Sequence, residues 1–197
     1  MRIIGGSAAR RILKAPAGLA VRPTPDRVKQ AIFNSLGGRV EGAVVLELYA
    51  GAGSLGLECL SRGAARLVAV EKSDRHARFI RDNLAQAGLS AVLLEMRTQE
   101  VQPALAQLTA IQARFDLILA DPPYGPKNVG KRSTSEAQKL LDDLNLPGLL
   151  NPGGLFILGH TKRDTLTIPS NWSDRKTLKH GDTIMRFLEC VTSENPR

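Results

Sequence analysis

The sequence of 197 residues predicts an α/β fold, with a doubly wound, mostly parallel sheet, a C-terminal antiparallel hairpin and a small basic N-terminal hairpin extension. Two observations carry this prediction. Short apolar stretches typical of buried strands alternate with amphipathic helical stretches from residue 43 onward. The connections between them are short, and such repeated strand–helix units require parallel strands joined by right-handed crossovers.

The first forty residues combine basic side chains with short apolar pairs. Residues 1–22 predict one or two short strands that form a hairpin. Residues 26–36 carry a helical stripe of apolar side chains, with Thr24 or Asp26 as the expected N-cap. Gly37 and Gly38 then end this helix.

The later elements are bounded by recognisable turn and cap residues. Ser73 and Gly88 cap one helix, residues 133–136 resemble a capping box, and residues 151–154 predict a turn. We expect strands at residues 43–48, 67–70, 91–94, 117–120 and 155–158, helices at 53–61, 73–87, 101–112 and 133–146, and a closing hairpin of 176–179 with 184–189.

The composition predicts a protein without membrane spans, disulfides or metal sites. Hydrophobic residues make up 43% of the chain, but no apolar run approaches the ~20 residues that span a bilayer. The N-terminus lacks the apolar segment of a signal peptide. Two cysteines, Cys59 and Cys190, and three histidines share no metal-ligand spacing. We expect a cytoplasmic monomer with no bound metal.

Positive charge is concentrated at the N-terminus. Residues 1–40 hold eight Lys and Arg and a single acid, Asp26, whereas residues 41–197 hold 19 basic and 18 acidic residues. We therefore divide the chain into a basic arm, residues 1–40, and a nearly neutral main domain, residues 41–197. Clustered positive charge is typical of a surface that binds a polyanion such as RNA. Apolar residues within the arm, such as Ile3 and Leu13, argue against a merely solvated tail.

The Asp-Pro-Pro-Tyr motif, residues 121–124, follows the apolar stretch 115–120. Ligands of open α/β sheets bind beyond the carboxyl ends of the strands, where this motif is expected. The Asp carboxylate and a Pro carbonyl offer two hydrogen-bond acceptors beside an aromatic ring, because prolines donate no N–H and hold their carbonyls stiffly. This arrangement suits a planar base with an exocyclic amino group. The alternative is a cis-proline turn that merely closes the strand.

A second candidate site lies at the first strand-to-helix turn. Gly51, Gly53 and Gly56 match the pattern G-x-G-x-x-G, and Glu71 follows at the end of the next strand. This spacing would also fit an NAD-dependent dehydrogenase. Glu47, however, would face a pyrophosphate unfavourably, whereas it suits the ammonium group of S-adenosylmethionine. We therefore expect that cofactor, with Glu71 at its ribose hydroxyls and turn N–H groups at its carboxylate.

Several stretches along nearly the whole chain form a specific combination. They are residues 1–6, 22–28, 33–34, 47–58, 61–64, 70–72, 115–124, 152–154 and 180–183. In combination they resemble the RsmD family of bacterial small-subunit rRNA guanine-N2 methyltransferases. The resemblance implies a Rossmann-like S-adenosylmethionine-dependent methyltransferase fold. It also implies methyl transfer to the N2 amino group of a guanine in 16S rRNA, in the assembled or assembling small subunit.

The motifs and the resemblance together give three sets of expected site residues. The catalytic set is Asp121, Pro122, Pro123 and Tyr124. The cofactor-binding set is Glu47, Tyr49, Ala50, Gly51, Gly53, Glu71, Lys72, Met96 and Arg97. The RNA-binding set is Arg2, Arg10, Arg11, Lys14, Arg22, Thr24 and Arg27.

The sequence departs from the family pattern in three places. The family usually shows Gly-Asp-Ala after the third strand, with the Asp at the adenine amine, whereas this chain has Met96-Arg97-Thr98. We therefore expect backbone groups to recognise adenine. Gly159 stands where the family often has an acid. The basic stretch 125–133 is longer than usual, and is either a solvated loop or a lip that touches RNA.

Two other functions remain open at this level. A methyltransferase acting on adenine N6 or cytosine N4 of DNA or another RNA would use the same Asp-Pro-Pro-Tyr motif, although the chain has no obvious target-recognition domain. A non-catalytic RNA-binding assembly factor would need neither Asp121 nor Glu71.

Overall fold

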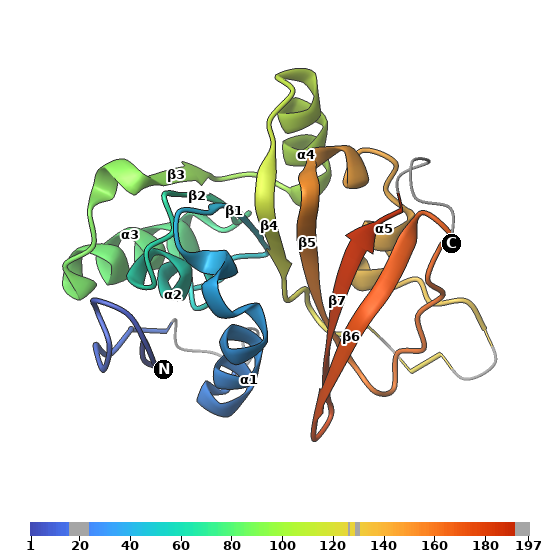
Figure 1. Ribbon diagram of the computed structural model, residues 1–197, viewed down its shortest axis with the longest axis horizontal. Helices are drawn as coiled ribbons and strands as arrows, with labels where there is room; N and C mark the ends of the chain where they lie inside the picture. Colours follow the sequence, from blue (N-terminus) through green and yellow to red (C-terminus); the bar gives the residue numbers. More distant parts are fainter. Residues whose placement is uncertain (16–23, 126, 129–130, 192–197) are drawn as a thin grey trace.

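A seven-stranded sheet forms the centre of the computed structural model, which describes residues 1–15, 24–125, 127–128 and 131–191. The strand order is β3-β2-β1-β4-β5-β7-β6 (Figure 1). β1 to β5 are parallel, and β7 pairs antiparallel with both β5 and β6. The strands are β1 Val44–Leu48, β2 Arg66–Val70, β3 Leu94–Arg97, β4 Phe115–Ala120, β5 Leu150–Thr161, β6 Trp172–His180 and β7 Thr183–Cys190.

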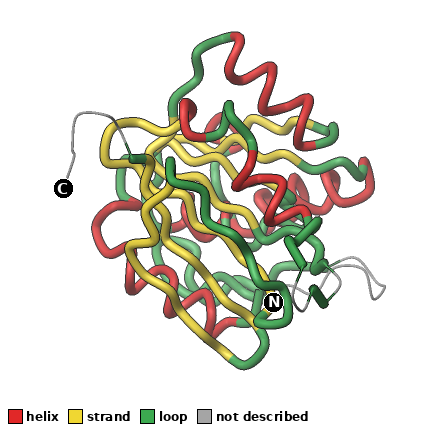
Figure 2. Tube along the Cα trace, turned by 90° about the vertical axis from the view of Figure 1, so that its right-hand side faces the viewer, coloured by secondary structure: helices red, strands yellow, loops and turns green. Residues whose placement is uncertain are grey.

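Helices cover both faces of this sheet (Figure 2). The described α-helices are α1 Asp26–Leu36, α2 Gly56–Ser61, α3 Asp74–Ala87, α4 Val101–Ala110 and α5 Glu136–Asp142. Short 3-10 helices span Gly37–Val40, Ala91–Leu93 and Pro147–Leu149. None of the helices within the described ranges is both long and apolar enough to cross a membrane.

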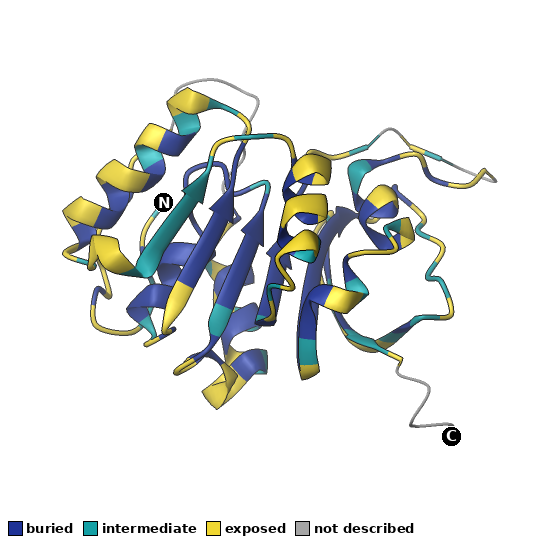
Figure 3. Cartoon of the chain, turned by 90° about the horizontal axis from the view of Figure 1, so that it is seen from above, coloured by how far each residue is buried: buried dark blue, intermediate teal, exposed yellow. Residues whose placement is uncertain are grey.

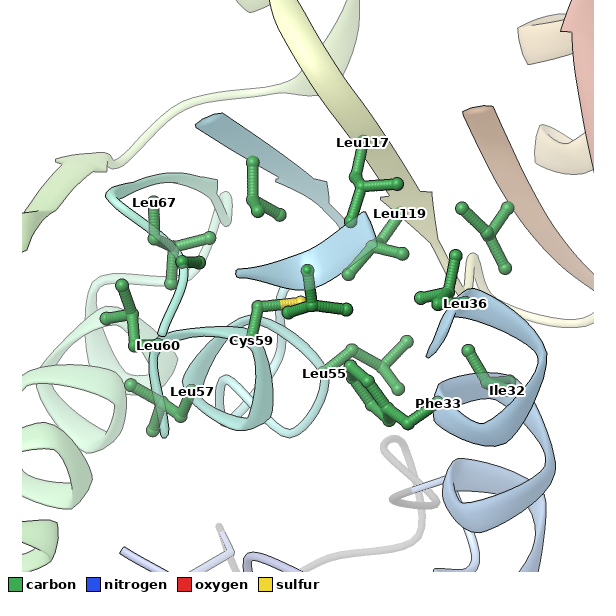
Figure 4. Packing of buried hydrophobic residues seen from close by; sticks show 14 of the residues in the cluster. Ile32, Phe33, Leu36, Leu55, Leu57, Cys59, Leu60, Leu67, Leu117 and Leu119 are labelled. Atoms are coloured by element: carbon green, nitrogen blue, oxygen red, sulfur yellow. The ribbon is translucent and has the colours of Figure 1, made fainter. Parts of the chain in front are cut away.

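Side chains of the central strands alternate between two apolar cores, one on each face of the sheet. On β4, Leu117 and Leu119 pack into the core beneath α1, α2 and α3, whereas Ile118 and Ala120 pack into the core beneath α4 and α5. Figure 4 shows the first core, where Leu117 and Leu119 of β4 lie in one cluster with the apolar face of α1 and with Leu55 and Cys59. The central strands are buried along most of their length (Figure 3). The predicted doubly wound α/β fold with its antiparallel C-terminal hairpin is confirmed.

The N-terminal hairpin, residues 1–15, packs on the core of α1, α2 and α3. An antiparallel bridge joins Arg2 to Ile12. Ile3 and Leu13 are buried in the core, whereas Ile12 is 68% exposed. The backbone of Lys14 exchanges hydrogen bonds of 2.8 and 2.9 Å with the side chain of Asn83 on α3. The hairpin therefore covers the domain core and carries its charged side chains outward.

A buried ion pair fixes this hairpin to α1 and α2. Lys29 Nζ lies 3.5 Å from Glu58 Oε2, and both side chains are fully buried. Lys29 also donates to the carbonyl of Arg2, and Glu58 accepts the N–H groups of Ile4 and Gly5 at 2.8 Å. Burial lowers the pKa of Lys29, and the neighbouring Glu58 carboxylate opposes this shift. Because an unpaired buried charge is costly, each partner depends on the other.

Some predicted element boundaries agree with the structure and others do not. α1 has the predicted bounds, and α3 has Ser73 at its N-cap and Gly88 in the left-handed conformation at its C-cap. The predicted third strand at 91–94 is wrong, because residues 91–93 form a 3-10 helix and β3 begins at Leu94. Residues 151–154 are not a separate turn. They lie within β5, where its register with β4 is irregular.

The predicted caps of two helices are also wrong. Pro25 occupies the N-cap position of α1, and its side chain has no atom that could accept a capping hydrogen bond. The hydroxyl of Thr24 donates to Asp121. α5 begins at Glu136, with Ser135 as the cap that accepts the N–H of Gln138, and it ends at Asp142. The hydroxyl of Ser133 instead bonds to Ser135.

Candidate active site

A cavity of about 870 Å³ opens at the carboxyl ends of β1, β2 and β4. The strand order reverses between β1 and β4, and open α/β sheets bind their ligands at such a switch point. The Asp-Pro-Pro-Tyr motif lines this cavity from β4. Tyr49, Gly51, Glu71 and Lys72 line it from the ends of β1 and β2. The structure thus brings the predicted catalytic residues and part of the predicted cofactor set to one place.

A smaller cavity of about 50 Å³ adjoins the first and shares Asp121, Tyr49 and Gly51 with it. Glu47, Ala50 and Ser54 line it from the glycine-rich turn, and Met1 and Thr24 line it from the basic arm. The basic arm therefore forms one wall of the site.

Asp121 has one oxygen in a hydrogen bond and one without. Oδ2 accepts the hydroxyl of Thr24 at 2.8 Å. Oδ1 is buried and has no hydrogen-bond partner among the described residues. A Cβ atom on Gly159 would lie only 2.6 Å from Oδ1, so the absence of a side chain at Gly159 leaves room for this carboxylate. Burial raises the pKa of Asp121, and the hydrogen bond from Thr24 opposes that shift.

The rest of the Asp-Pro-Pro-Tyr motif leads from the core to the surface. Pro122 is buried and Pro123 is exposed. Tyr124 is 49% exposed, and its hydroxyl lies 3.2 Å from Oγ1 of Thr183, the first residue of β7. The described residues contain no cis peptide bond, so the alternative of a cis-proline turn is wrong. An exposed aromatic ring at the cavity edge can stack on a planar ligand.

Glu71 holds the glycine-rich turn in place. Its Oε2 accepts the N–H of Gly51 at 2.8 Å, and its Oε1 accepts the N–H of Ser73 at 2.9 Å. His76 Nδ1 lies 3.5 Å from Oε1. Both carboxylate oxygens are therefore partnered, while the side chain still lines the large cavity and retains acceptor capacity for a ligand hydroxyl.

Glu47 is buried with one oxygen that lacks a protein partner. Oε1 accepts the N–H of Leu55 at 3.1 Å, whereas Oε2 and the hydroxyl of Ser54 are buried without a hydrogen-bond partner in the described part of the chain. Burial raises the pKa of Glu47 to about 7; the backbone N–H groups of Gly56 and Leu55 oppose this rise, and the carboxylates of Glu71 and Asp121 add to it. A buried carboxylate of this kind can bind a ligand cation, which would supply the missing partner.

The N–H groups of the glycine-rich turn are largely used inside the protein. Glu71 takes the N–H of Gly51, the Ala50 carbonyl takes that of Gly53 at 2.8 Å, and Glu47 takes that of Leu55. These three groups are thus not open to the cofactor carboxylate, contrary to the expectation from the sequence pattern. Gly53 lines neither cavity. A Cβ atom at this position would lie 3.2 Å from Leu57 and 3.3 Å from Ile80.

Two predicted cofactor residues, Met96 and Arg97, lie away from both cavities. Met96 packs against the core of α1, α2 and α3, and Arg97 Nε pairs with Glu95 at 2.7 Å. Residues 99–102 line the large cavity in their place. Sequence reasoning missed them because the third strand was expected three residues too early, and a correct strand end at Arg97 would have pointed to the residues that follow it.

Tyr49 and two residues of α5 close another side of the large cavity. Tyr49 has a φ of 55°, and its hydroxyl donates to Glu136 at 2.8 Å. Burial raises the pKa of Tyr49 well above its usual value. Lys139 pairs with Glu136 at 2.7 Å, and Lys72 lies 3.5 Å from Glu100. The capping-box motif predicts a helix start around Glu136 but not a place in the site, which Glu136 and Lys139 reach through the packing of α5.

The predicted RNA-binding residues fall into different environments. Arg10, Arg11, Lys14 and Arg27 are exposed and form no ion pair with any described residue. Arg2 pairs with Asp26 at 2.7 Å. Arg22 lies outside the described residues. Thr24 is buried against Asp121, so it belongs to the site and not to the arm's outer surface.

The basic stretch 125–133 is described only in part. Lys127 and Lys131 are exposed, and Arg132 pairs with Asp142 at 2.7 Å. Within the described ranges, no group of three or more His, Cys, Asp or Glu side chains could hold a metal ion.

Known proteins are similar to this chain in sequence and fold. A family model described as "Conserved hypothetical protein 95" matches residues 1–189. The Ribosomal RNA small subunit methyltransferase D of Haemophilus influenzae is 32% identical over 96% of this chain and 93% of its own, and that of Escherichia coli K12 is 29% identical over 96% and 89%. The structure of a hypothetical protein of a Thermus species superposes with a TM-score of 0.78 at 29% identity, covering 96% of this chain and 99% of its own. The chain therefore belongs to the family described as "Conserved hypothetical protein 95", which is the RsmD family that its motifs resemble.

Proposed function

We propose that this protein is an S-adenosylmethionine-dependent methyltransferase of ribosomal RNA, and that its target is the N2 amino group of a guanine in the 16S rRNA of an assembled or assembling small subunit. The observation that carries this proposal is Asp121, whose Oδ1 is buried without a partner among the described residues, beside Pro122 at a cavity that also contains Glu71 and adjoins Glu47. The relatives named Ribosomal RNA small subunit methyltransferase D support rRNA as the substrate class.

The cofactor fits the groups around the two cavities. Oε2 of Glu47 and the Ser54 hydroxyl lack partners in the described chain beside the small cavity, and they would bind the ammonium and carboxylate end of the cofactor. Glu71 would accept the ribose hydroxyls from the large cavity. Gln99 and Gln102 lie where the adenine would be expected, next to the end of β3. When bound, S-adenosylmethionine supplies an electrophilic methyl group on its sulfonium.

Asp121 and Pro122 would orient the target amino group. The exocyclic nitrogen of guanine is a poor nucleophile because its lone pair is delocalised into the ring. Two acceptors, the Asp121 carboxylate and the Pro122 carbonyl, would receive its two N–H bonds and direct the nitrogen toward the methyl group. Orientation of this kind can lower the barrier by several kcal/mol. As the nitrogen gains the methyl group it loses one proton, which Asp121 or water accepts.

Tyr124 would hold the base. It is half exposed at the cavity edge, and a base turned out of its RNA stack needs a new stacking partner. Stacking on an aromatic side chain contributes ~1–3 kcal/mol per base.

The basic arm would bind RNA phosphates through Arg10, Arg11, Lys14 and Arg27, which are exposed and form no ion pair with any described residue. Binding must then release counterions, so affinity should fall by ~0.7–0.9 log units per phosphate contact for each tenfold rise in salt. Reversal of Arg10 and Arg11 to Glu should flatten this slope. A matched control reverses Arg114 and Lys176, two exposed residues of the main domain. An unchanged slope in the Arg10 and Arg11 variant, with folding confirmed by thermal melts, would remove the arm from the RNA contact.

The function itself is tested by transfer of a tritiated methyl group from S-adenosylmethionine to small ribosomal subunits, naked 16S rRNA and duplex DNA. Nucleoside analysis of the product then identifies the acceptor atom. Label in N2-methylguanosine supports the proposal, with an Asp121→Asn protein as the inactive control. Label in N6-methyladenosine or N4-methylcytidine would replace guanine as the target. Absence of label from all three substrates would favour a non-catalytic RNA-binding protein.

A further inference from the structure

Thr24 is in contact with the proposed catalytic carboxylate, although it was expected to bind RNA or to cap α1. It is only 7% exposed. Its hydroxyl donates to Asp121 Oδ2 at 2.8 Å across 97 residues of sequence, and it caps no helix end. Within the described chain, this is the hydrogen bond that holds the Asp121 carboxylate, because Oδ1 has no partner there.

We propose that Thr24 is a positioning residue: its hydroxyl sets the orientation of the Asp121 carboxylate, and thereby joins the basic arm to the amino-group acceptor of the site. This inference rests on the proposed function only for the role of Asp121 in methyl transfer. The hydrogen bond that carries it is a property of the protein alone.

Geometry explains why one hydroxyl can set this carboxylate. Oδ2 is fixed by Thr24, and Oδ1 faces the backbone of Gly159 on β5, where a Cβ would lie only 2.6 Å away. A rotated carboxylate would lose the hydrogen bond on one side and remain restricted by β5 on the other. Thr24 therefore selects one orientation of a group that has no second hydrogen-bond partner among the described residues.

Thr24 lies where the basic arm enters α1, so its hydrogen bond connects this part of the arm to Asp121. Thr24 comes directly before Pro25 and α1, and the exposed Arg27 lies in the first turn of that helix. Movement of this segment when RNA phosphates bind would be transmitted to Asp121 through a single hydrogen bond. The segment 24–27, which would approach RNA, and the Asp121 carboxylate, which would receive the base, are thus joined by a hydrogen bond.

The first test measures Asp121 in the protein without RNA. Carbon-13 NMR of labelled Asp carboxyls, with the Asp121 signal assigned by Asp121→Asn, gives its titration in wild type, Thr24→Val and Thr24→Ser. Thr24→Val keeps the shape but removes the donor, so the pKa of Asp121 should rise by roughly one to two pH units. Thr24→Ser should restore the wild-type value. The other titratable groups around the two cavities are the same in all three proteins and cancel in the comparison; they are the Met1 α-amino group, Glu47, Tyr49, Glu71, Lys72, His76, Glu100, Tyr124, Glu136 and Lys139.

The second test measures methyl transfer. Thr24→Val should lower kcat at neutral pH by roughly tenfold, move the acid limb of the pH–rate profile upward by the same shift as the NMR titration, and leave cofactor affinity unchanged. Ser35→Ala is the matched control, since the Ser35 hydroxyl bonds to the Ala31 carbonyl within α1 and lies away from both cavities. An unshifted Asp121 titration in folded Thr24→Val overturns the positioning role. A wild-type protein that transfers no methyl group would instead sink the proposed function, and the NMR result would still decide the role of Thr24.

Discussion

The two halves of the site hold their carboxylates in opposite ways. At the end of β2, Glu71 is fixed by two backbone N–H groups, from Gly51 and Ser73, which lie 20 and 2 residues away in the sequence. At the end of β4, Asp121 is held by the Thr24 hydroxyl, which lies 97 residues away, and its second oxygen has no partner among the described residues. The Glu71 carboxylate is thus fixed from within the β1–β2 half, whereas the Asp121 carboxylate of the β4 half depends on the N-terminal segment.

This difference distinguishes a carboxylate that stabilises the surrounding backbone from one that can bind the reacting ligand. A carboxylate saturated by backbone donors stabilises the turn that surrounds it, while still offering lone pairs to a ligand. A buried carboxylate oxygen without a partner has a desolvation cost that the folded protein alone does not offset. Such costs concentrate at functional sites, where a ligand supplies the missing partner. Glu47 lies in the β1–β2 half, but like Asp121 it has a buried oxygen without a partner among the described residues.

The largest expected effect is at Asp121. Asp121→Asn keeps the shape but replaces an acceptor oxygen with a donor N–H₂ group, which would oppose the target amino group. We expect kcat to fall by roughly 10²–10³-fold, as when one preorganised hydrogen-bonding group is lost from an active site. Cofactor affinity should remain near wild type, because the cofactor groups belong to the β1–β2 half. Single-turnover methyl transfer and calorimetry with S-adenosylmethionine measure the two quantities separately. A variant that transfers methyl at close to the normal rate would refute the role of Asp121.

Glu47 should show a trade between stability and cofactor binding. Its folded-state pKa is about 7, above its ordinary value of 4.5. The folded protein therefore binds a proton between these values that the unfolded chain releases. This contribution to stability is complete below about pH 4.5 and is lost as the pH rises to about 7, with a total of up to roughly 3 kcal/mol.

Glu47→Gln removes this titration. The variant should be more stable than wild type at pH 8 and nearly equal to it at pH 4.5, as measured by denaturant unfolding at both values. The same change should weaken S-adenosylmethionine at pH 8, because a neutral amide attracts an ammonium group less than a carboxylate does. Equal pH dependence of unfolding in the two proteins would show that folding does not shift the pKa of Glu47, and Glu47 would then not resemble Asp121.

Most of the fold and half of the site could be predicted from the sequence because their causes are local. The apolar strands, the Ser73 cap and the glycine-rich turn are encoded within a few residues of one another. The boundary of β3 was missed for a local reason: the apolar run 91–94 resembles a buried strand, although Leu94–Arg97, which alternates apolar and charged side chains and is half-buried, is the strand. The position of Met96 and Arg97 was lost with that boundary.

The second half of the site depends on long-range packing, which a local pattern does not contain. Thr24 was expected at an N-cap or at RNA, and its actual partner, Asp121, follows from the placement of the basic arm over the sheet. Glu136 approaches Tyr49 because α5 packs, together with α4, on the face of the sheet opposite to α1, α2 and α3. The unpartnered oxygens of Glu47 and Asp121 are likewise visible only in three dimensions.

Glu71 should contribute to the stability of the fold as well as to cofactor binding, because it accepts two backbone N–H groups. Glu71→Ala leaves the N–H groups of Gly51 and Ser73 without their acceptor, so we expect a loss of roughly 1–3 kcal/mol in the free energy of unfolding. Cofactor affinity should fall by a comparable amount, because the turn and the ribose contact are lost together. Glu71→Gln keeps one acceptor and should lie between Glu71→Ala and wild type. If Glu71→Ala weakens the cofactor but leaves unfolding unchanged, Glu71 is a ligand group only, and the two halves of the site differ less than their hydrogen bonds indicate.

The smallest expected effect concerns the hydroxyl of Tyr124. Its ring lies at the cavity edge, and its hydroxyl is 3.2 Å from Thr183 Oγ1. If the ring acts by stacking, Tyr124→Phe should retain methyl transfer within about threefold, whereas Tyr124→Ala should lose the ~1–3 kcal/mol that base stacking supplies. Thr183→Val removes the same hydroxyl contact from the other side. The Tyr124→Phe and Thr183→Val changes, made singly and together, should each have small and non-additive effects on kcat/KM. If Tyr124→Phe loses as much methyl transfer as Tyr124→Ala, the hydroxyl and not the ring is the group that matters. The β4 half would then depend on Thr183 of β7 as well as on the N-terminal segment.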